Sequence, residues 1–101
     1  MHPTRWIVTH YDYLTATSGK RVILKEVGFP TAGDSCCDEQ GQAELFERTS
    51  ASGIDFFFFE AFDQPFKAGH AVEGHWGLYR ANGSAKRVID WVMKAGPPRA
   101  R

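Results

Sequence analysis

The chain has 101 residues, and its 12 basic and 12 acidic side chains cancel, which gives no electrostatic basis for binding nucleic acid or an anionic membrane surface. A hydrophobic content of 43%, with 14% aromatic residues, predicts a folded domain with a core. No apolar run approaches the ~20 residues of a membrane-spanning helix, and the first residues lack the layout of a signal peptide, so the cellular location stays open.

The first part of the chain predicts a helix followed by a strand. An apolar stripe that includes Ile7 and Tyr11 indicates a helix over residues 3–14. A break at residues 18–20 then leads into a strand over residues 21–26. The continuous Val-Ile-Leu run of this strand is typical of a strand covered on both faces in a parallel α/β sheet.

Glu26 stands where this strand ends and a loop rich in Gly and Pro begins. In parallel sheets, and above all in (β/α)8 barrels, the chemistry lies at the carboxyl ends of the strands. Alternation along the strand predicts that Glu26 continues the line of Val22 and Leu24. Packing explains a glutamate at such a position poorly, so Glu26 is the first candidate for a catalytic carboxylate.

A second helix and a second strand follow the loop of residues 27–37. We expect Asp34 or Ser35 to cap this helix, with Asp38 and Glu39 in its first turn. The helix runs to about Thr49, buries Ala43 and Phe46, and stops at Ser52 and Gly53. Residues 54–60 then form another apolar strand, which again ends in a carboxylate.

The last third of the chain is a long loop, residues 61–82, followed by an amphipathic helix that residues 96–98 close. The apolar stripe of this helix comprises Ala85, Val88, Ile89, Val92 and Met93. The order helix, strand, helix, strand, helix favours parallel βα units. Two strands cannot form a covered parallel sheet, and a (β/α)8 barrel needs about 250 residues. We therefore expect an α/β chain that holds two βα units of something larger.

Metal and nucleophile motifs are absent from the sequence. The four histidines show no metal-ligand spacing. Cys36 and Cys37 are adjacent, which strains a disulfide between them, and no further ligands stand nearby. We expect two ordinary thiols, no metal site and no cofactor.

The carboxylates after the two strands are suited to glycoside hydrolysis, which uses one carboxyl group as acid and one as nucleophile or base. Glu26 and Glu60 end strands that would lie about 4.8 Å apart if paired, so they form one possible acid and nucleophile pair. In the alternative, one is catalytic and the other makes structural hydrogen bonds. Trp76, among polar side chains, suggests a platform for a sugar face, although aromatics in this loop can equally pack it against the helices.

Three blocks of sequence carry a resemblance to a known family: residues 25–34 read KEVGFPTAGD, residues 59–67 read FEAFDQPFK, and residues 73–79 read EGHWGLY. In this order they resemble the C-terminal part of family 17 glycoside hydrolases, the β-1,3-glucanase family. The resemblance covers about residues 19–94, and residues 1–101 as a whole are then the C-terminal part of a (β/α)8 barrel.

The resemblance implies a retaining hydrolase in which Glu26, on the seventh strand, is the nucleophile, and residues 54–60 form the eighth strand. Lys67 and Glu73 match positions that line the cleft and support the catalytic carboxylates, and Trp76 matches the Trp-Gly-Leu motif near it. The substrate-binding residues expected are Phe29, Glu60, Asp63, Lys67, Glu73 and Trp76.

Two departures from the family pattern stand out. Gln64 occupies a position where the family commonly has a Glu, which removes a charge from the supporting network. The acid/base Glu of the family comes from the fourth strand, and no residue of this chain corresponds to it. The resemblance therefore argues against the Glu26 and Glu60 pair, and Glu60 becomes a subsite or structural residue.

The sequence thus predicts a β-1,3-glucan hydrolase that needs no cofactor, metal or nucleic acid. Transglycosylation is an alternative, because an acceptor sugar can replace water in the same chemistry. A third possibility is a truncated product that at most binds glucan, or that folds only with the missing barrel half. Linkage preference, and endo or exo action, stay open.

Overall fold

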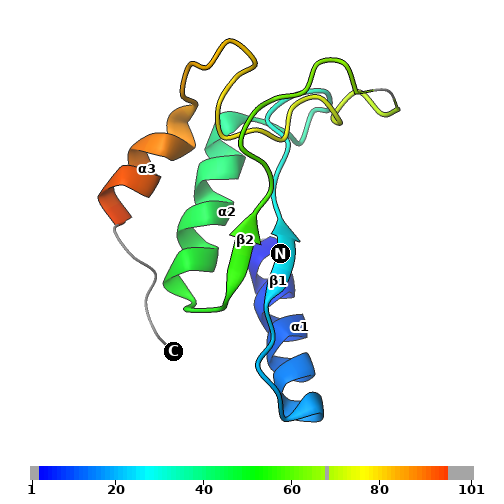
Figure 1. Cartoon of the computed structure of the whole chain (residues 1–101), viewed down its shortest axis with the longest axis vertical. Coiled ribbons are helices and arrows are strands. Elements are labelled where there is room, and N and C mark those ends of the chain that lie inside the picture. Colours follow the sequence, from blue (N-terminus) through cyan, green and yellow to red (C-terminus); the bar gives the residue numbers. More distant parts are fainter. Residues whose placement is uncertain (1–2, 68, 96–101) are drawn as a thin grey trace.

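The computed structural model describes residues 3–67 and 69–95 and has the element order that the sequence predicts. Both strands are shorter than predicted. The first helix is longer than predicted, because it continues past its apolar stripe to Ser18 and stops at Gly19. The elements are α1 (Pro3–Ser18), β1 (Leu24–Val27), α2 (Glu39–Ala51), β2 (Phe56–Phe58) and α3 (Arg87–Ala95) (Figure 1).

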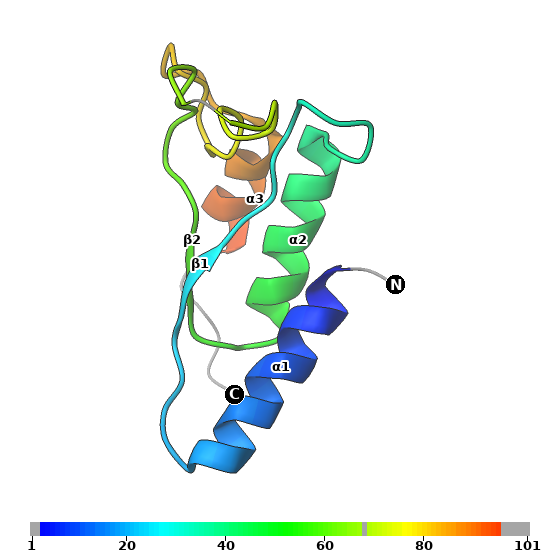
Figure 2. The same ribbon diagram turned by 90° about the vertical axis from the view of Figure 1, so that its right-hand side faces the viewer.

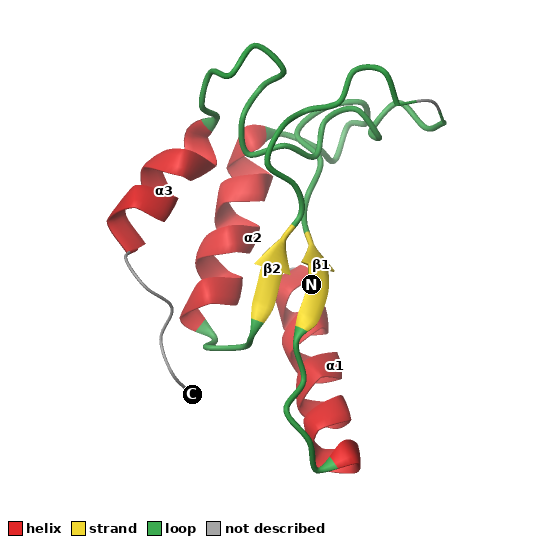
Figure 3. Ribbon diagram, viewed as in Figure 1, coloured by secondary structure: helices red, strands yellow, loops and turns green. Residues whose placement is uncertain are grey.

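The two strands pair in parallel, as the βα order requires. All three helices lie on one side of this sheet, and α2 packs against both α1 and α3 (Figures 2 and 3). The opposite face of the sheet has no helix over it within the described residues, and Phe57 on β2 is 66% exposed. The covered and open faces together resemble two neighbouring βα units of a larger parallel sheet.

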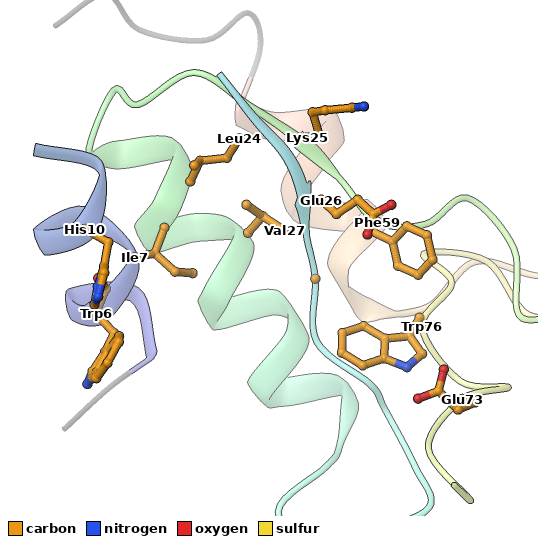
Figure 4. A pocket seen from close by; sticks show the side chains of 11 residues that line it. Trp6, Ile7, His10, Leu24, Lys25, Glu26, Val27, Phe59, Glu73 and Trp76 are labelled. Carbon is orange, nitrogen blue, oxygen red and sulfur yellow. The ribbon is translucent and has the colours of Figure 1, made fainter. Parts of the chain in front are cut away.

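An irregularity in β1 corrects the expected direction of Glu26. Leu24 pairs with Phe56 and Val27 with Phe58, so three steps along β1 match two along β2. Such a bulge reverses the alternation of side chains. Leu24 and Val27 both point toward the helices, whereas Glu26 points to the other side (Figure 4). The prediction that Glu26 continues the line of Leu24 was wrong.

The core is built around an aromatic cluster between α2 and the sheet. The ring of Phe46 meets Phe58 and Trp91 edge-on, with centroids 5.3 and 5.9 Å apart. Leu45 on α2 and Val88 on α3 are fully buried. The predicted burial of Ala43 is confirmed, whereas Phe46 is only half-buried.

The α3 stripe is realised only in part. Val88 is buried, but Met93 is 79% exposed and Ala85 precedes the helix. The proposed stop at residues 96–98 lies outside the described residues.

Asp38, and not Asp34 or Ser35, is the N-cap of α2. Its carboxylate accepts a hydrogen bond from Gly41 N at 2.7 Å, whereas the Asp34 carboxylate is bonded to Ser35 N. Ser52 caps the other end, as predicted, by donating its N–H to Arg48 O. None of the helices in the described part of the chain is both long and apolar enough to cross a membrane.

Candidate active site

Loops that follow the two strands gather at one end of the sheet (Figure 1). The segment of residues 76–79 runs beside residues 60–63 through backbone hydrogen bonds, among them Glu60 N to Trp76 O at 3.1 Å and Leu78 N to Glu60 O at 2.8 Å. Two of the three blocks recognised in the sequence are thereby held side by side. They lie at the carboxyl end of β2, where a parallel sheet places its functional loops.

A cavity of about 680 Å³ lies at the edge of β1 (Figure 4). Glu26 on the strand lines it together with Glu73 and Trp76 from the loop. The other wall is α1, through Trp6 and its neighbours. The structure therefore brings the expected nucleophile, one expected supporting carboxylate and the expected aromatic into one site.

Gly28 explains how β1 comes so close to Trp76. A Cβ at this position would lie 2.3 Å from Phe59 O, closer than real contacts allow, and 3.1 Å from Trp76 Cε3, which is a tight contact. Only a glycine therefore lets the chain after Glu26 pass between β2 and the indole. The ring of Trp76 also packs edge-on against Phe59, with centroids 6.1 Å apart. Trp76 is thus fixed near the end of β1 by contacts on two sides.

Glu60 is at the centre of a small polar network. Its carboxylate accepts hydrogen bonds from Lys67 Nζ, at 3.1 Å, and from Gln64 Nε2. The Lys67 ammonium also lies 5.0 Å from the centroid of the Phe59 ring. Lys67 is thus paired with Glu60, and no ion pair involves Glu26 in residues 3–67 and 69–95. Neither Lys67 nor Glu60 is among the side chains that line the cavity.

Asp63 is held by protein groups. Its Oδ1 accepts from Lys86 Nζ at 2.6 Å and from Gly77 N at 2.9 Å. The Lys86 side chain is only 2% exposed and also donates to Thr31 Oγ1 at 2.9 Å. This buried ion pair joins the loops that follow both strands.

Phe29 faces α2. A Cβ on Gly41 would lie 2.7 Å from the Phe29 ring, so the ring packs closely on the first turn of the helix. Phe29 is not part of the cavity lining. Its carbonyl lies 3.4 Å from the buried Gln42 Nε2, which also donates to Gly77 O at 2.9 Å.

Sequence reasoning missed Lys86 and Gln42, two buried polar residues that stabilise the loops. Lys86 precedes an amphipathic helix, where a charged residue gives no signal of burial. Gln42 lies within the predicted second helix and is fully buried. Both residues act on segments distant in sequence, so their roles depend on the tertiary arrangement.

The adjacent thiols of Cys36 and Cys37 lie in the loop before α2 and are free. Burial, followed by the contact with Cys36 and the nearby acidic side chains, raises the pKa of Cys37 to about 11. No group of three or more His, Cys, Asp and Glu side chains in the described segments is arranged to hold a metal ion.

Comparisons with known proteins identify related sequences, although no protein-family model matches the chain. A glucan 1,3-beta-glucosidase of Arthroderma benhamiae is 38% identical over 89 residues, which cover 72% of this chain and 29% of that protein. A protein of Aspergillus niger, provisionally named glucan endo-1,3-beta-glucosidase btgC, is 32% identical over 94 residues, which cover 69% of this chain and 14% of that protein. The chain therefore spans less than a third of the length of these relatives.

Two solved structures share the fold. The glycoside hydrolase family 17 beta-1,3-glucanosyltransferase of Rhizomucor miehei superposes with a TM-score of 0.68 at 28% identity. An active-site mutant of the beta-1,3-glucanosyltransferase of this fungus, in complex with laminaritriose, gives a TM-score of 0.72 at 26% identity. Each match covers 84% of this chain and 35% of the other. The resemblance inferred from the three sequence blocks is confirmed.

Proposed function

We propose that this glycoside hydrolase-like chain supplies the seventh and eighth strands of a (β/α)8 barrel that acts on β-1,3-glucan. The basis is its similarity to the C-terminal part of family 17. The observation that carries the proposal is the position of Glu26 at the carboxyl end of a parallel strand, in one cavity with Glu73 and Trp76. Residues 1–101 form one part of that barrel. The open face of the sheet at Phe57 is then its interior.

Glu26 is the nucleophile of a retaining reaction in this proposal. Its carboxylate attacks the anomeric carbon and forms a covalent glycosyl-enzyme, while an acid protonates the leaving glycosidic oxygen. Water, activated by the same acid after it has lost its proton, then releases the sugar with retained configuration. The acid/base comes from a strand outside this chain, since no residue here matches its family position.

Trp76 provides the sugar-binding surface. An indole offers an apolar face to the carbon-bound hydrogens of a pyranose and a polar N–H at its edge. Trp76 Nε1 is buried and has no hydrogen-bond partner among the residues that the structure describes, so the proposed contact with the sugar is made by the apolar part of the ring. Glu73 lines the same cavity and provides acceptors for sugar hydroxyl groups. In this proposal the other expected binding residues shape the loops around this surface. These residues are Phe29, Glu60, Asp63 and Lys67.

Transglycosylation is a second candidate function, because two related solved structures are named β-1,3-glucanosyltransferases. The glycosyl-enzyme on Glu26 is common to both reactions, and only the acceptor differs. Product lengths at high laminari-oligosaccharide concentration separate them. Oligosaccharides longer than the donor indicate transfer, and shorter products alone indicate hydrolysis.

The remaining barrel strands are the expected partner of this chain, either in the same polypeptide or as a separate one. Turnover of a soluble β-1,3-glucan tests the proposal, measured for the 101-residue chain and for this chain joined to the upstream part of a family 17 barrel. We expect activity only in the joined protein, lost in Glu26→Gln and kept in the exposed control Glu47→Gln on α2. If the 101-residue chain alone is active and Glu26→Gln abolishes that activity, the expectation that the acid/base lies outside this chain is wrong. Unchanged activity of the joined Glu26→Gln variant would exclude Glu26 as nucleophile.

A further inference from the structure

We propose that Lys86 is a positioning residue for the sugar-binding wall. Its buried ammonium holds together the loop after β1 and the loops after β2, and so fixes Trp76 beside the end of β1. This deepens the function proposed above, since the glucan is the ligand that the wall would bind. The positioning itself depends only on contacts within the chain.

The contacts of Lys86 span three separate segments. Its Nζ donates to Asp63 Oδ1 at 2.6 Å, to Thr31 Oγ1 at 2.9 Å and, more weakly, to His75 O at 3.5 Å. An ammonium has three donors and no acceptor, so each hydrogen has one of these oxygens to meet. Thr31 follows β1, whereas Asp63 and His75 follow β2. The one side chain thus joins segments up to 55 residues apart in sequence.

Because the Lys86 site is buried, it accepts a lysine side chain but not other cationic side chains. The side chain is 2% exposed and that of Asp63 is 14% exposed. A buried ion pair adds little net stability over an apolar pair, but the loss of one partner leaves a charge without compensation. A lysine ammonium is a compact point charge, whereas the arginine guanidinium is a wide planar fork that needs a different set of acceptors. Substitution of Lys86 by Arg is therefore not conservative here.

The path from Lys86 to Trp76 is short. Asp63 Oδ1, which bonds the ammonium, also accepts from Gly77 N at 2.9 Å. Gly77 has no space for a side chain, since a Cβ would lie 2.2 Å from Asp63 N. Gly77 O accepts from the buried Gln42 Nε2. The residue directly after Trp76 is thus bonded on both sides, and Lys86 holds one of the two partners.

The test uses the full 101-residue chain labelled with 5-fluorotryptophan, in which ¹⁹F NMR reports on each of the three tryptophans separately. A Trp76→Phe variant assigns the Trp76 signal. The test variant is Lys86→Met, which keeps the length of the side chain without its charge. Lys94→Met, which changes an exposed lysine on α3, the helix that directly follows Lys86, is the matched control.

We expect Lys86→Met to shift or split the Trp76 signal while the Trp6 signal stays in place, and Lys94→Met to change neither. A Trp76 signal identical to that of the wild type in folded Lys86→Met would overturn the proposal. If Lys86→Met loses its helical circular dichroism, the variant Lys86→Met with Asp63→Asn replaces it, because it leaves no unpaired buried charge. A shifted Trp76 signal in that variant supports the proposal, and an unchanged one overturns it.

Laminaritriose, added to the same labelled samples, separates this proposal from the proposed function. If the wall binds β-1,3-glucan, the wild-type Trp76 signal titrates with laminaritriose, and Lys86→Met weakens the binding at least tenfold. Absence of any titration in the wild type would count against glucan binding by this chain. The effect of Lys86→Met on the Trp76 signal without ligand would still decide the positioning role.

Discussion

Lys67 Nζ lies 3.1 Å from Glu60 Oε2, and this ion pair connects the loop after β2 to the end of that strand. The Glu60 side chain is only 11% exposed, so water cannot easily replace the ammonium as its partner. The resemblance to the family assigns Lys67 to the support of the catalytic carboxylates. The contact with Glu60 indicates that any such support of Glu26 is indirect, through the shape of the loop.

Lys67→Met should lower the free energy of unfolding by about 1.5–3 kcal/mol, the range for a hydrogen bond to a charged group. The cause is the partly buried Glu60 carboxylate, which loses its cationic partner. Arg21→Met is the matched control, because Arg21 pairs with Asp55 at the surface, where ion pairs contribute little. Urea denaturation of the two variants measures the difference. Equal, small losses in both would contradict a supporting role for the Lys67 pair.

Gly28→Ala should displace the Trp76 segment. The added methyl group would lie 2.3 Å from the Phe59 carbonyl oxygen, a backbone atom that cannot rotate away. We expect a loss of about 1–3 kcal/mol in the free energy of unfolding, typical of overpacking, and a change in tryptophan emission. Retention of wild-type stability and emission would show that β1 and the Trp76 loop are not packed together in solution.

Trp76→Ala should reduce the affinity for laminaritriose by about tenfold, which corresponds to about 1.4 kcal/mol. The matched control is Trp6→Ala on the α1 wall of the same cavity. If the sugar occupies the wall that carries Glu26, the Trp6 variant keeps its affinity within about twofold. Isothermal titration on the joined barrel measures both. The reverse order of effects would place the ligand against α1 instead.

The stability of the chain should fall as the pH rises from about 9 to about 11. The pKa of Cys37 is raised from 9.0 to about 11 in the folded chain, mainly because the half-buried thiol is partly desolvated and next because it contacts Cys36. In that interval the unfolded state releases the proton while the folded state keeps it, so folding is disfavoured as the pH increases. Denaturation midpoints of the wild type and of Cys37→Ser, measured at pH 8 and pH 10.5, test this. A decline of equal size in both proteins would rule out Cys37 as the cause.

The element order and the parallel pairing could be predicted because both follow from apolar runs and short connections. The place of Glu26 at a strand end could be predicted for the same reason. Its direction could not, because the bulge between Leu24 and Val27 appears only when β1 is paired with β2. Alternation in a single strand assumes a regular ladder, and this strand lacks one.

The hydrogen bonds and ion pairs between the polar side chains of the loops could not be predicted from the sequence either. Asp63 was expected to bind substrate, yet its carboxylate is bonded to Lys86, 23 residues away. A pairing at that separation depends on how the loops fold back on the sheet. The cap of α2 shows a local version of this problem. Asp34, Ser35 and Asp38 are all good cap residues, and the turn geometry selects Asp38.

The role of Glu26 as nucleophile is the central claim, and trapping of the glycosyl-enzyme tests it most directly. A 2-deoxy-2-fluoro-β-laminaribiosyl fluoride is a suitable reagent, because its fluoride leaves without an acid and the 2-fluoro group slows release of the sugar. Mass spectrometry of the peptides from the labelled, joined barrel should locate the sugar on Glu26, with no label in Glu26→Gln. A sugar on Glu60 or Glu73, or labelling that persists in Glu26→Gln, would contradict the account.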